Sequence, residues 1–339
     1  MLRLPLIGLV TIDYTKRIPV FPVSVYSLDS VVTPLFKIGV DGGGTKTECI
    51  LVDARGEIVA RHLAPGCNPN QAGPEKARAI LHDALTALLG AAKIAPGKPQ
   101  ISTTLLCMAG NRGFWRETAE ALPGFGAVTT LDDSRPVLEL ATDGAPGLVL
   151  HAGTGSFIAA RDPAGAIHYA GGLGWKLGDP GSGFDLGRRA VALALLELQN
   201  PAHAGSTPPS PLRVALGAHT GLTEYPVLSR FFYNDAGANA SIAAFAPRVI
   251  ELAATGDHPA QQVLTDSLTA LARQADTVIH RHFPGVSTRR PCGVSGRILN
   301  SMPAGLIIRS LADKLSWPVE LRFIDTAPIE GVRRLLGKM

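Results

Sequence analysis

Short apolar runs separated by glycine-rich turns begin at Phe36 and predict strands, because each run is four to six residues long and ends in a turn. A longer segment at 74–89 repeats apolar residues at helical spacing, with Ala77, Leu81 and Leu88 on one face. The elements predicted in this half are, in order, strands at 36–41, 49–53 and 57–60, a helix at 74–89, a strand at 102–108, a helix near 114–122 and a strand near 127–131.

The same order of elements returns from Gly147 onward. The predicted elements there are strands at 147–151, 157–160 and 166–170, helices at 186–198, around 240–254 and at 260–282, a strand at 290–294, a helix at 299–315, a strand at 319–324 and a helix at 328–336. The sequence therefore predicts an α/β protein of two βββαβα units, the second enlarged by helices. The expected lobes are residues 36–145 and 146–339.

Residues 1–35 are set apart from this pattern. An apolar start is interrupted by the polar segment 11–17, and no small-residue cleavage site follows it. We expect an N-terminal extension of uncertain order rather than a signal peptide.

Composition favours a globular protein that can bury sizeable apolar cores. Apolar residues make up 46% of the 339 residues and charged residues 18%. The net charge is +4, and Lys and Arg occur in scattered doublets, which argues against nucleic-acid binding. No apolar stretch approaches the roughly 18 residues of a membrane span, so we expect no membrane partner.

The four cysteines are far apart and form no Cys-x-x-Cys pair. This spacing gives no support to a disulfide scaffold, a zinc site or a cysteine-held iron–sulfur cluster. We expect buried thiols in a reducing cytoplasm. The four are Cys49, Cys67, Cys107 and Cys292.

The chain has 37 glycines, about 11% of its residues against a usual ~7%, and they occur in clusters. Two of these clusters form turns that each follow a predicted strand. Such turns can bring backbone N–H groups close to an anion, because no Cβ obstructs the approach. Asp41, at the end of the first strand, would repel phosphate and is better suited to hold the water shell of Mg²⁺. Two such turns facing each other could clasp a triphosphate, although each alone could be a tight hairpin.

Three motifs carry a family resemblance. The segments 41–47 (DGGGTKT), 151–156 (HAGTGS) and 171–183 (GGLGWKLGDPGSG) are similar to the N-acetylglucosamine kinase and BadF/BadG/BcrA/BcrD ATPase family, within the sugar kinase, Hsp70 and actin superfamily. The similarity covers residues 36–332. It implies two ribonuclease-H-like (actin-like ATPase) lobes that hold ATP and a sugar between them.

The resemblance also implies roles for individual residues. Two phosphate loops are implied at Gly43, Gly44, Thr45 and Lys46, and at Gly153, Thr154 and Gly155. An adenosine-contacting turn is implied at Gly293 and Gly296, and a closing helix start at Pro328 and Gly331. Sugar contacts are implied for Asn68, Gly172, Leu173, Gly174 and Asp179.

The expected catalytic base is Asp133, which matches the aspartate of the family's Asn-Asp-Ala motif, with Asp132 in the place of the Asn. The alternatives are structural: Asp132 as a helix N-cap and Asp133 as a first-turn carboxylate that interacts with the helix dipole. The chain departs from the family at Pro180, where Glu is usual, and at 109–112, where some members carry an aspartate.

Histidines give weaker signals. We expect His151, at the end of a strand, to be a packed rather than a catalytic residue, and His280 and His282, on either side of Arg281, to be exposed on a helix.

The function predicted by the resemblance is ATP- and Mg²⁺-dependent phosphorylation of the 6-hydroxyl of an amino sugar, most simply N-acetylglucosamine. Glucosamine or glucose as acceptor, an activator ATPase and a non-catalytic sugar sensor are the alternatives. A homodimer is left open.

Overall fold

Five strands of the first half form a mixed sheet in the computed structural model, which describes residues 35–93, 101–200, 208–285 and 288–339. The strand order is β3-β2-β1-β4-β5, in which β2 is antiparallel to β1 and β3, while β1, β4 and β5 run parallel. The strands are β1 (Phe36–Gly42), β2 (Lys46–Val52), β3 (Ile58–Pro65), β4 (Ile101–Met108) and β5 (Ala127–Asp132). Residues 1–34, and with them the expected extension, lie outside the described residues.

The second half builds a second sheet with the same plan. Its order, β8-β7-β6-β9-β10, repeats that of the first sheet strand for strand, including the antiparallel β6–β7–β8 pairs and the parallel β6–β9–β10 pairs. The strands are β6 (Gly147–Ala152), β7 (Ser156–Arg161), β8 (Ile167–Gly171), β9 (Arg290–Ser295) and β10 (Val319–Ile324). The predicted α/β class with two repeated units is therefore confirmed.

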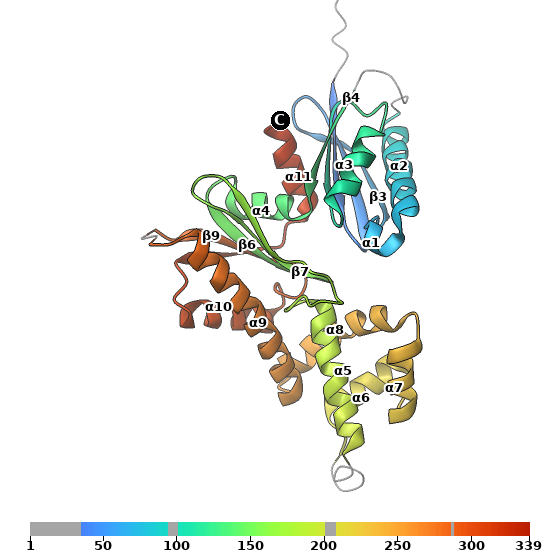
Figure 1. The fold of residues 1–339 in the computed structure, drawn as a ribbon, viewed down its shortest axis with the longest axis vertical. Coiled ribbons are helices and arrows are strands. Elements are labelled where there is room, and N and C mark those ends of the chain that lie inside the picture. Colours follow the sequence, from blue (N-terminus) through green and yellow to red (C-terminus); the bar gives the residue numbers. More distant parts are fainter. Residues whose placement is uncertain (1–34, 94–100, 201–207, 286–287) are drawn as a thin grey trace, which may run out of the picture. The chain divides into compact units, whose positions relative to one another are not determined.

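Helices connect and cover the strands (Figure 1). In the first half they are α1 (Pro69–Ala72), α2 (Pro74–Ala91), α3 (Arg112–Glu120) and α4 (Ser134–Thr142). In the second half they are α5 (Gly183–Gln199), α6 (Pro211–Thr220), α7 (Tyr225–Asn234), α8 (Ala238–Ala254), α9 (His258–His282), α10 (Met302–Lys314) and α11 (Pro328–Gly337). The short helices α1, α6 and α7 were not anticipated by the periodicity, which is weak over so few turns.

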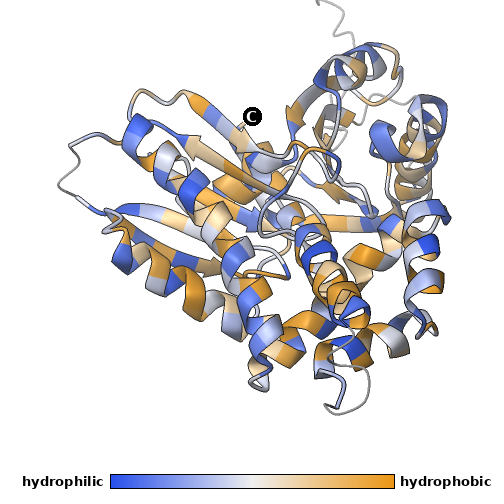
Figure 2. Ribbon diagram, turned by 60° about the horizontal axis from the view of Figure 1, so that its bottom comes forward, coloured by the Kyte–Doolittle hydropathy of each residue, from blue (hydrophilic) through white to orange (hydrophobic). Residues whose placement is uncertain are grey.

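Apolar burial explains this arrangement. Figure 2 shows strands that are largely orange and helices that carry both colours, as expected for helices with one face against a core. In α2, the apolar face predicted at helical spacing is buried, with Ala77, Leu81 and Leu88 fully enclosed. These residues pack against strand residues that include Ile38 and Leu106.

Helices α4 and α11 each pack on the sheet of the other half of the chain. Residues of α11 share a core with β2 and β4 of the first sheet, and residues of α4 share a core with β6, β7 and β10 of the second. The α11 core holds Ile50, Val52, Leu105, Cys107, Ile329, Val332 and Leu336. The α4 core holds Val137, Leu138, Ala141, Val149, Phe157, Ala159 and Ile324.

Helices α4 and α11, which each cover the sheet of the other half, touch at their backbones. A Cβ on Gly331 of α11 would lie 2.1 Å from the carbonyl oxygen of Pro136 in α4, a distance that only glycine permits. The contact between α4 and α11 is visible in Figure 1. The glycine four residues into the last helix, which the family resemblance singled out, is therefore a packing glycine.

Candidate active site

Backbone hydrogen bonds hold the first glycine turn against neighbouring segments. The Gly43 N–H donates to the Lys46 carbonyl (2.9 Å), and the Gly43 carbonyl accepts from the Cys67 N–H (3.1 Å). The Gly42 carbonyl accepts from the N–H of Ala109 (2.7 Å). Gly44 and Thr45 remain exposed at the tip, so their backbone and hydroxyl donors are open to a ligand.

Two residues outside the motif also shape this turn. A Cβ on Gly66 would lie 2.0 Å from the Gly44 carbonyl oxygen, so the chain after β3 passes directly against the turn. A Cβ on Gly44 would lie 2.5 Å from Oε1 of Gln71, which places the α1 side chain at the tip. The glycine motif did not indicate Gly66 or Gln71, because both come from the segment after the third strand.

Lys46, expected in the first phosphate loop, forms an ion pair with Glu48. Its Nζ lies 3.1 Å from a Glu48 carboxylate oxygen, and Glu48 also binds Arg61 (3.3 Å). The Lys46 side chain is half exposed, so this surface pair contributes little to stability and can open. Burial and the charge of Asp133 raise the pKa of Asp41, and the charge of Lys46 offsets part of that rise.

The second glycine turn repeats the geometry of the first. The Gly153 N–H donates to the Gly155 carbonyl (2.8 Å), and Thr154 and Gly155 are exposed. Helix α5 begins at this turn, since its first residue, Gly183, donates its N–H to the Gly153 carbonyl (2.8 Å). The N-terminus of this 17-residue helix carries a partial positive charge, which favours an anion at the turn.

The two glycines expected to contact adenosine lie in different environments. Gly296 has φ +95°, and its α-carbon lies against the end of β6, where a Cβ would be 2.2 Å from the Ala152 carbonyl oxygen. Gly296 therefore adjoins the second turn. Gly293 lies inside β9, where a Cβ would lie 2.6 Å from Ala141 of α4, so close helix packing accounts for it.

The segment 172–179, expected to bind sugar, is tied to the second turn. Asp179 is buried, and its Oδ1 accepts from the Gly174 N–H (3.1 Å), while its Oδ2 lies 3.1 Å from an ideal Cβ on Gly155. The Gly172 N–H donates to the Ser156 carbonyl (3.0 Å). Leu173 is 60% exposed at the tip of the segment.

Pro180 contributes to the same segment through its main chain. Its carbonyl accepts a hydrogen bond from the Ser156 hydroxyl at 2.7 Å. Any residue can provide this acceptor, so the replacement of the family's usual Glu leaves the link between the segment and β7 in place.

Asn68 caps the helix that follows it. Its Oδ1 accepts from the Asn70 N–H at 3.0 Å and lies 2.6 Å from an ideal Cβ on Gly110. A bound sugar could therefore use the Asn68 side-chain NH₂ as a donor, while the oxygen is engaged by α1.

Asp132 and Asp133 have separate environments. The Asp132 Oδ1 accepts from the N–H of Ser134 (3.2 Å) and from its hydroxyl, and Oδ2 accepts from Arg112 (2.7 Å). Asp132 is the last residue of β5 and not the N-cap that was one of the alternatives, although its carboxylate accepts from the first N–H of α4. Asp133 occupies the N-cap backbone position of α4, but its side chain makes no capping hydrogen bond among the described residues.

Asp41, near the end of β1, and Asp133, directly after β5, are called the acidic pair here because the charge of Asp133 acts on Asp41. Burial is the largest cause, and the charge of the Asp133 carboxylate the second largest, of a rise in the pKa of Asp41 from an ordinary 3.8 to about 7. For Asp133, burial is again the largest cause and the charge of Asp132 the second largest, and its pKa is raised to about 6. The two carboxylates are half-buried, and the charge of Asp133 acts on Asp41. Carboxylate oxygens suit both Mg²⁺, which prefers oxygen ligands, and a general base.

Aromatic side chains from the second sheet lie near this pair. The rings of His151, Phe157 and Tyr169 stack in a column, with centroid separations of 4.8 and 5.6 Å. Burial has the largest effect on the pKa of Tyr169 and raises it, and the charge of Asp133 raises it further, which places the phenol in the field of Asp133. Burial lowers the pKa of His151 to about 4, so it is neutral at pH 7, as the packing interpretation requires.

The four cysteines are buried, as expected, and all are free thiols. In the described parts of the chain, no helix is both long and apolar enough to span a lipid bilayer.

Comparison with known proteins agrees with this geometry. A Dictyostelium discoideum protein named N-acetyl-D-glucosamine kinase is 27% identical over 258 residues, which cover 72% of this chain and 79% of that protein. A Clostridium acetobutylicum N-acetylmuramic acid/N-acetylglucosamine kinase is 26% identical over 165 residues, 47% of this chain and 53% of that protein.

A crystal structure from Chromobacterium violaceum, of a protein provisionally named as an N-acetylglucosamine kinase, superposes with a TM-score of 0.71 and 25% identity. The superposition covers 90% of this chain and 99% of that one. Residues 38–286, most of the chain, match the BadF/BadG/BcrA/BcrD ATPase family. With its repeated sheets and paired glycine turns, the chain belongs to this ATPase family.

Proposed function

We propose that this protein is an ATP-dependent sugar kinase that transfers a phosphoryl group to the 6-hydroxyl of N-acetylglucosamine. Two relatives that carry this kinase name, one of them matched over 79% of its length, support the sugar class. The observation that carries the proposal is the acidic pair. Burial, followed by the charge of Asp133, raises the pKa of Asp41 to about 7, and burial, followed by the charge of Asp132, raises the pKa of Asp133 to about 6. Asp41 directly precedes the first glycine turn, whose tip residues Gly44 and Thr45 are exposed.

Each residue of the site has a role in this proposal. Asp133 accepts the proton of the sugar hydroxyl, for which its pKa of about 6 suits a base at neutral pH. The donors of the exposed tip residues 44–45 and 154–155 bind phosphate oxygens. Asp41 holds the water shell of Mg²⁺, which when bound neutralises charge on the transferred phosphoryl group.

The sugar side of the site is proposed to be the Asn68 amide and the segment 172–179. The Asn68 NH₂ can donate to a sugar oxygen, since its carbonyl oxygen is engaged by α1. Asp179 is proposed to accept from sugar hydroxyls through an oxygen that lies near Gly155, while its other oxygen holds the Gly174 N–H. Gly172, Leu173 and Gly174 are proposed to contact the sugar, and the first two of them are exposed.

A panel of sugars tests the substrate. We expect ADP release to be stimulated most by N-acetylglucosamine and less, by about tenfold or more in kcat/KM, by glucosamine and glucose, because an acceptor site built for the acetamide leaves polar groups unpaired without it. The measurement is sugar-dependent ADP formation, with the phosphorylated position read by NMR.

ADP release that no sugar stimulates would contradict the kinase proposal. Phosphate on a hydroxyl other than the 6-position would contradict its regiochemistry while leaving the kinase class in place.

The raised pKa values predict a pH profile. Asp133 accepts a proton only when ionised, so kcat/KM for the sugar is expected to fall as the pH is lowered from about 7 to 5, through the raised pKa values of the pair. A carboxylate with an ordinary pKa near 4 would give a flat profile over this window, and that outcome would contradict the assignment. The profile is measured in a discontinuous assay, so that coupling enzymes do not contribute their own pH dependence.

The two non-kinase alternatives receive less support. An activator ATPase needs exposed cysteines for a bridging iron–sulfur cluster, and the four thiols are buried. A sugar sensor was suggested by Pro180, but the Pro180 carbonyl keeps the contact with Ser156.

A further inference from the structure

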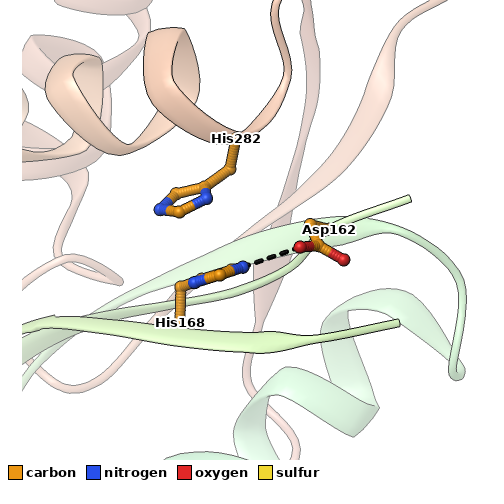
Figure 3. A group of neighbouring side chains, drawn as sticks. All are labelled: Asp162, His168 and His282. Atoms are coloured by element: carbon orange, nitrogen blue, oxygen red, sulfur yellow. Dashed lines mark hydrogen bonds and ion pairs between the residues drawn. The ribbon is translucent and has the colours of Figure 1, made fainter. Parts of the chain in front are cut away.

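A group of metal-ligating side chains lies where the β7–β8 hairpin meets the end of α9 (Figure 3). Asp162 directly follows β7, His168 lies in β8, and His282 is the last residue of α9. One ligand atom from each of the three lies within 4.8 Å of the others. None of these residues belongs to the candidate active site.

The hairpin fixes the carboxylate. The Asp162 Oδ1 accepts from the N–H groups of Ala164 and Ala166, both at 2.9 Å. The remaining oxygen, Oδ2, lies 2.8 Å from Nε2 of His168. The hairpin N–H groups thus orient the carboxylate, and the carboxylate orients the imidazole of His168, as the outer contacts of metal sites do.

His282 completes the group from the other side. The sequence predicted an exposed His282, but its ring is half-buried and stacks on His168, with ring centroids 3.6 Å apart. Its neighbour His280 is exposed, as expected, and binds Asp276 instead. The last turn of α9 therefore directs one histidine into the group and one toward solvent.

The three side chains are of the kinds that bind transition-metal ions. Two imidazoles and one carboxylate are a ligand set that suits Zn²⁺ and similar ions better than Mg²⁺.

The group opens onto a cavity of about 470 Å³, lined by Arg112, Ile167, His168, Tyr169, Arg281 and His282. Arg112 is paired with Asp132, and Arg281 is the remaining cation on this wall. An ion held by three protein ligands would keep its open positions toward this cavity, where water or an anion near Arg281 could complete the coordination.

We propose that Asp162, His168 and His282 bind one divalent transition-metal ion of the zinc class. The ion takes the place of the hydrogen bond between His168 and Asp162, and the proton on Nε2 is released or moves to Nδ1. His282 rotates out of the ring stack so that a nitrogen lone pair points at the ion. Binding ties the β7–β8 hairpin to the end of α9.

The test uses the full chain with millimolar Mg²⁺ present, which occupies oxygen sites such as Asp41 without competing strongly for imidazole. Equilibrium dialysis with Zn²⁺ is expected to give one bound ion per chain, and Co²⁺ is expected to give a visible absorption band. The variants His168→Gln and His282→Gln are each expected to lower the affinity at least about tenfold.

The matched control is His280→Gln, which removes a histidine two residues away on the same helix and is expected to bind Zn²⁺ like the unmodified chain. Asp162→Asn adds a second comparison, because the amide oxygen can still accept from the hairpin N–H groups while the charged ligand is lost. It is expected to weaken binding with little change in thermal unfolding.

The proposal would be overturned if the unmodified chain did not bind Zn²⁺ stoichiometrically. It would also be overturned if His282→Gln and His280→Gln bound Zn²⁺ with equal affinity. Zn²⁺ binding by Asp133→Asn is expected to equal that of the unmodified chain, so the metal site and the proposed kinase activity can fail independently.

Discussion

Replacing Asp133 with asparagine is expected to lower kcat for sugar phosphorylation by about 10²–10⁴-fold, the usual contribution of a positioned general base. The amide keeps the size of the side chain but cannot take the proton of the hydroxyl. ATP affinity is expected to change little, because the glycine turns do not depend on this side chain. Steady-state kinetics and nucleotide titration measure the two effects separately.

The same substitution is expected to stabilise the protein when Mg²⁺ is absent. Asp133 has a folded-state pKa of about 6, above its ordinary 3.8, so the folded state holds the proton more tightly than the unfolded state. The carboxylate therefore favours folding at low pH and destabilises the fold as the pH rises from about 4 to 6. At pH 8 the asparagine variant should gain roughly 1–3 kcal/mol in the free energy of unfolding.

The matched control is Asp143→Asn, at the other end of α4. Asp143 has φ +50°, a conformation that asparagine adopts readily, and its side chain is exposed. This variant is expected to keep both activity and stability. If Asp133→Asn retained turnover, Asp133 would not be the base. If its stability at pH 8 were also unchanged, the ionised Asp133 carboxylate would not destabilise the fold.

Replacing Gly66 with alanine is expected to lower kcat/KM for ATP by about 10²-fold, the order of effect that a shift of about 1 Å causes in a reacting group. The new Cβ would lie 2.0 Å from the Gly44 carbonyl oxygen, so the tip of the first turn must move. Gly66 itself offers no side chain to a ligand. The measurement is ATP kinetics together with binding of a nucleotide analogue.

Gly90→Ala in α2 is the control for Gly66→Ala, because a Cβ there meets none of the described atoms within 4 Å. It is expected to leave the kinetics unchanged and to stabilise the helix by up to about 1 kcal/mol. Unchanged ATP kinetics in Gly66→Ala would mean that the first turn does not bind the nucleotide.

The repeated sheets could be predicted from the sequence because each strand ends in a glycine or polar turn that marks its boundary. The runs at 36–41 and 147–151 correspond to β1 and β6, the central strands of the two sheets. The exchange of α4 and α11 could not be predicted in this way. An apolar helical face indicates burial but does not indicate which sheet it covers.

The candidate site was predictable where a motif lies on one continuous segment, as in 43–46 and 153–155. Gly66, Gln71 and Tyr169 were missed because they meet the site through tertiary contacts from other elements. Gly293 and Gly296 looked alike in sequence, but one packs under α4 and the other adjoins the second turn. Proximity in sequence could not separate these roles.

The place of α11 has a consequence for how the protein is made. The first sheet is complete by Asp132, yet one side of its strands is covered by Ile329, Val332 and Leu336, almost 200 residues later in translation. When only the first half of the chain has emerged from the ribosome, the apolar surface of β2 and β4 is therefore uncovered. Chaperones would have time to bind this surface before the last helix emerges.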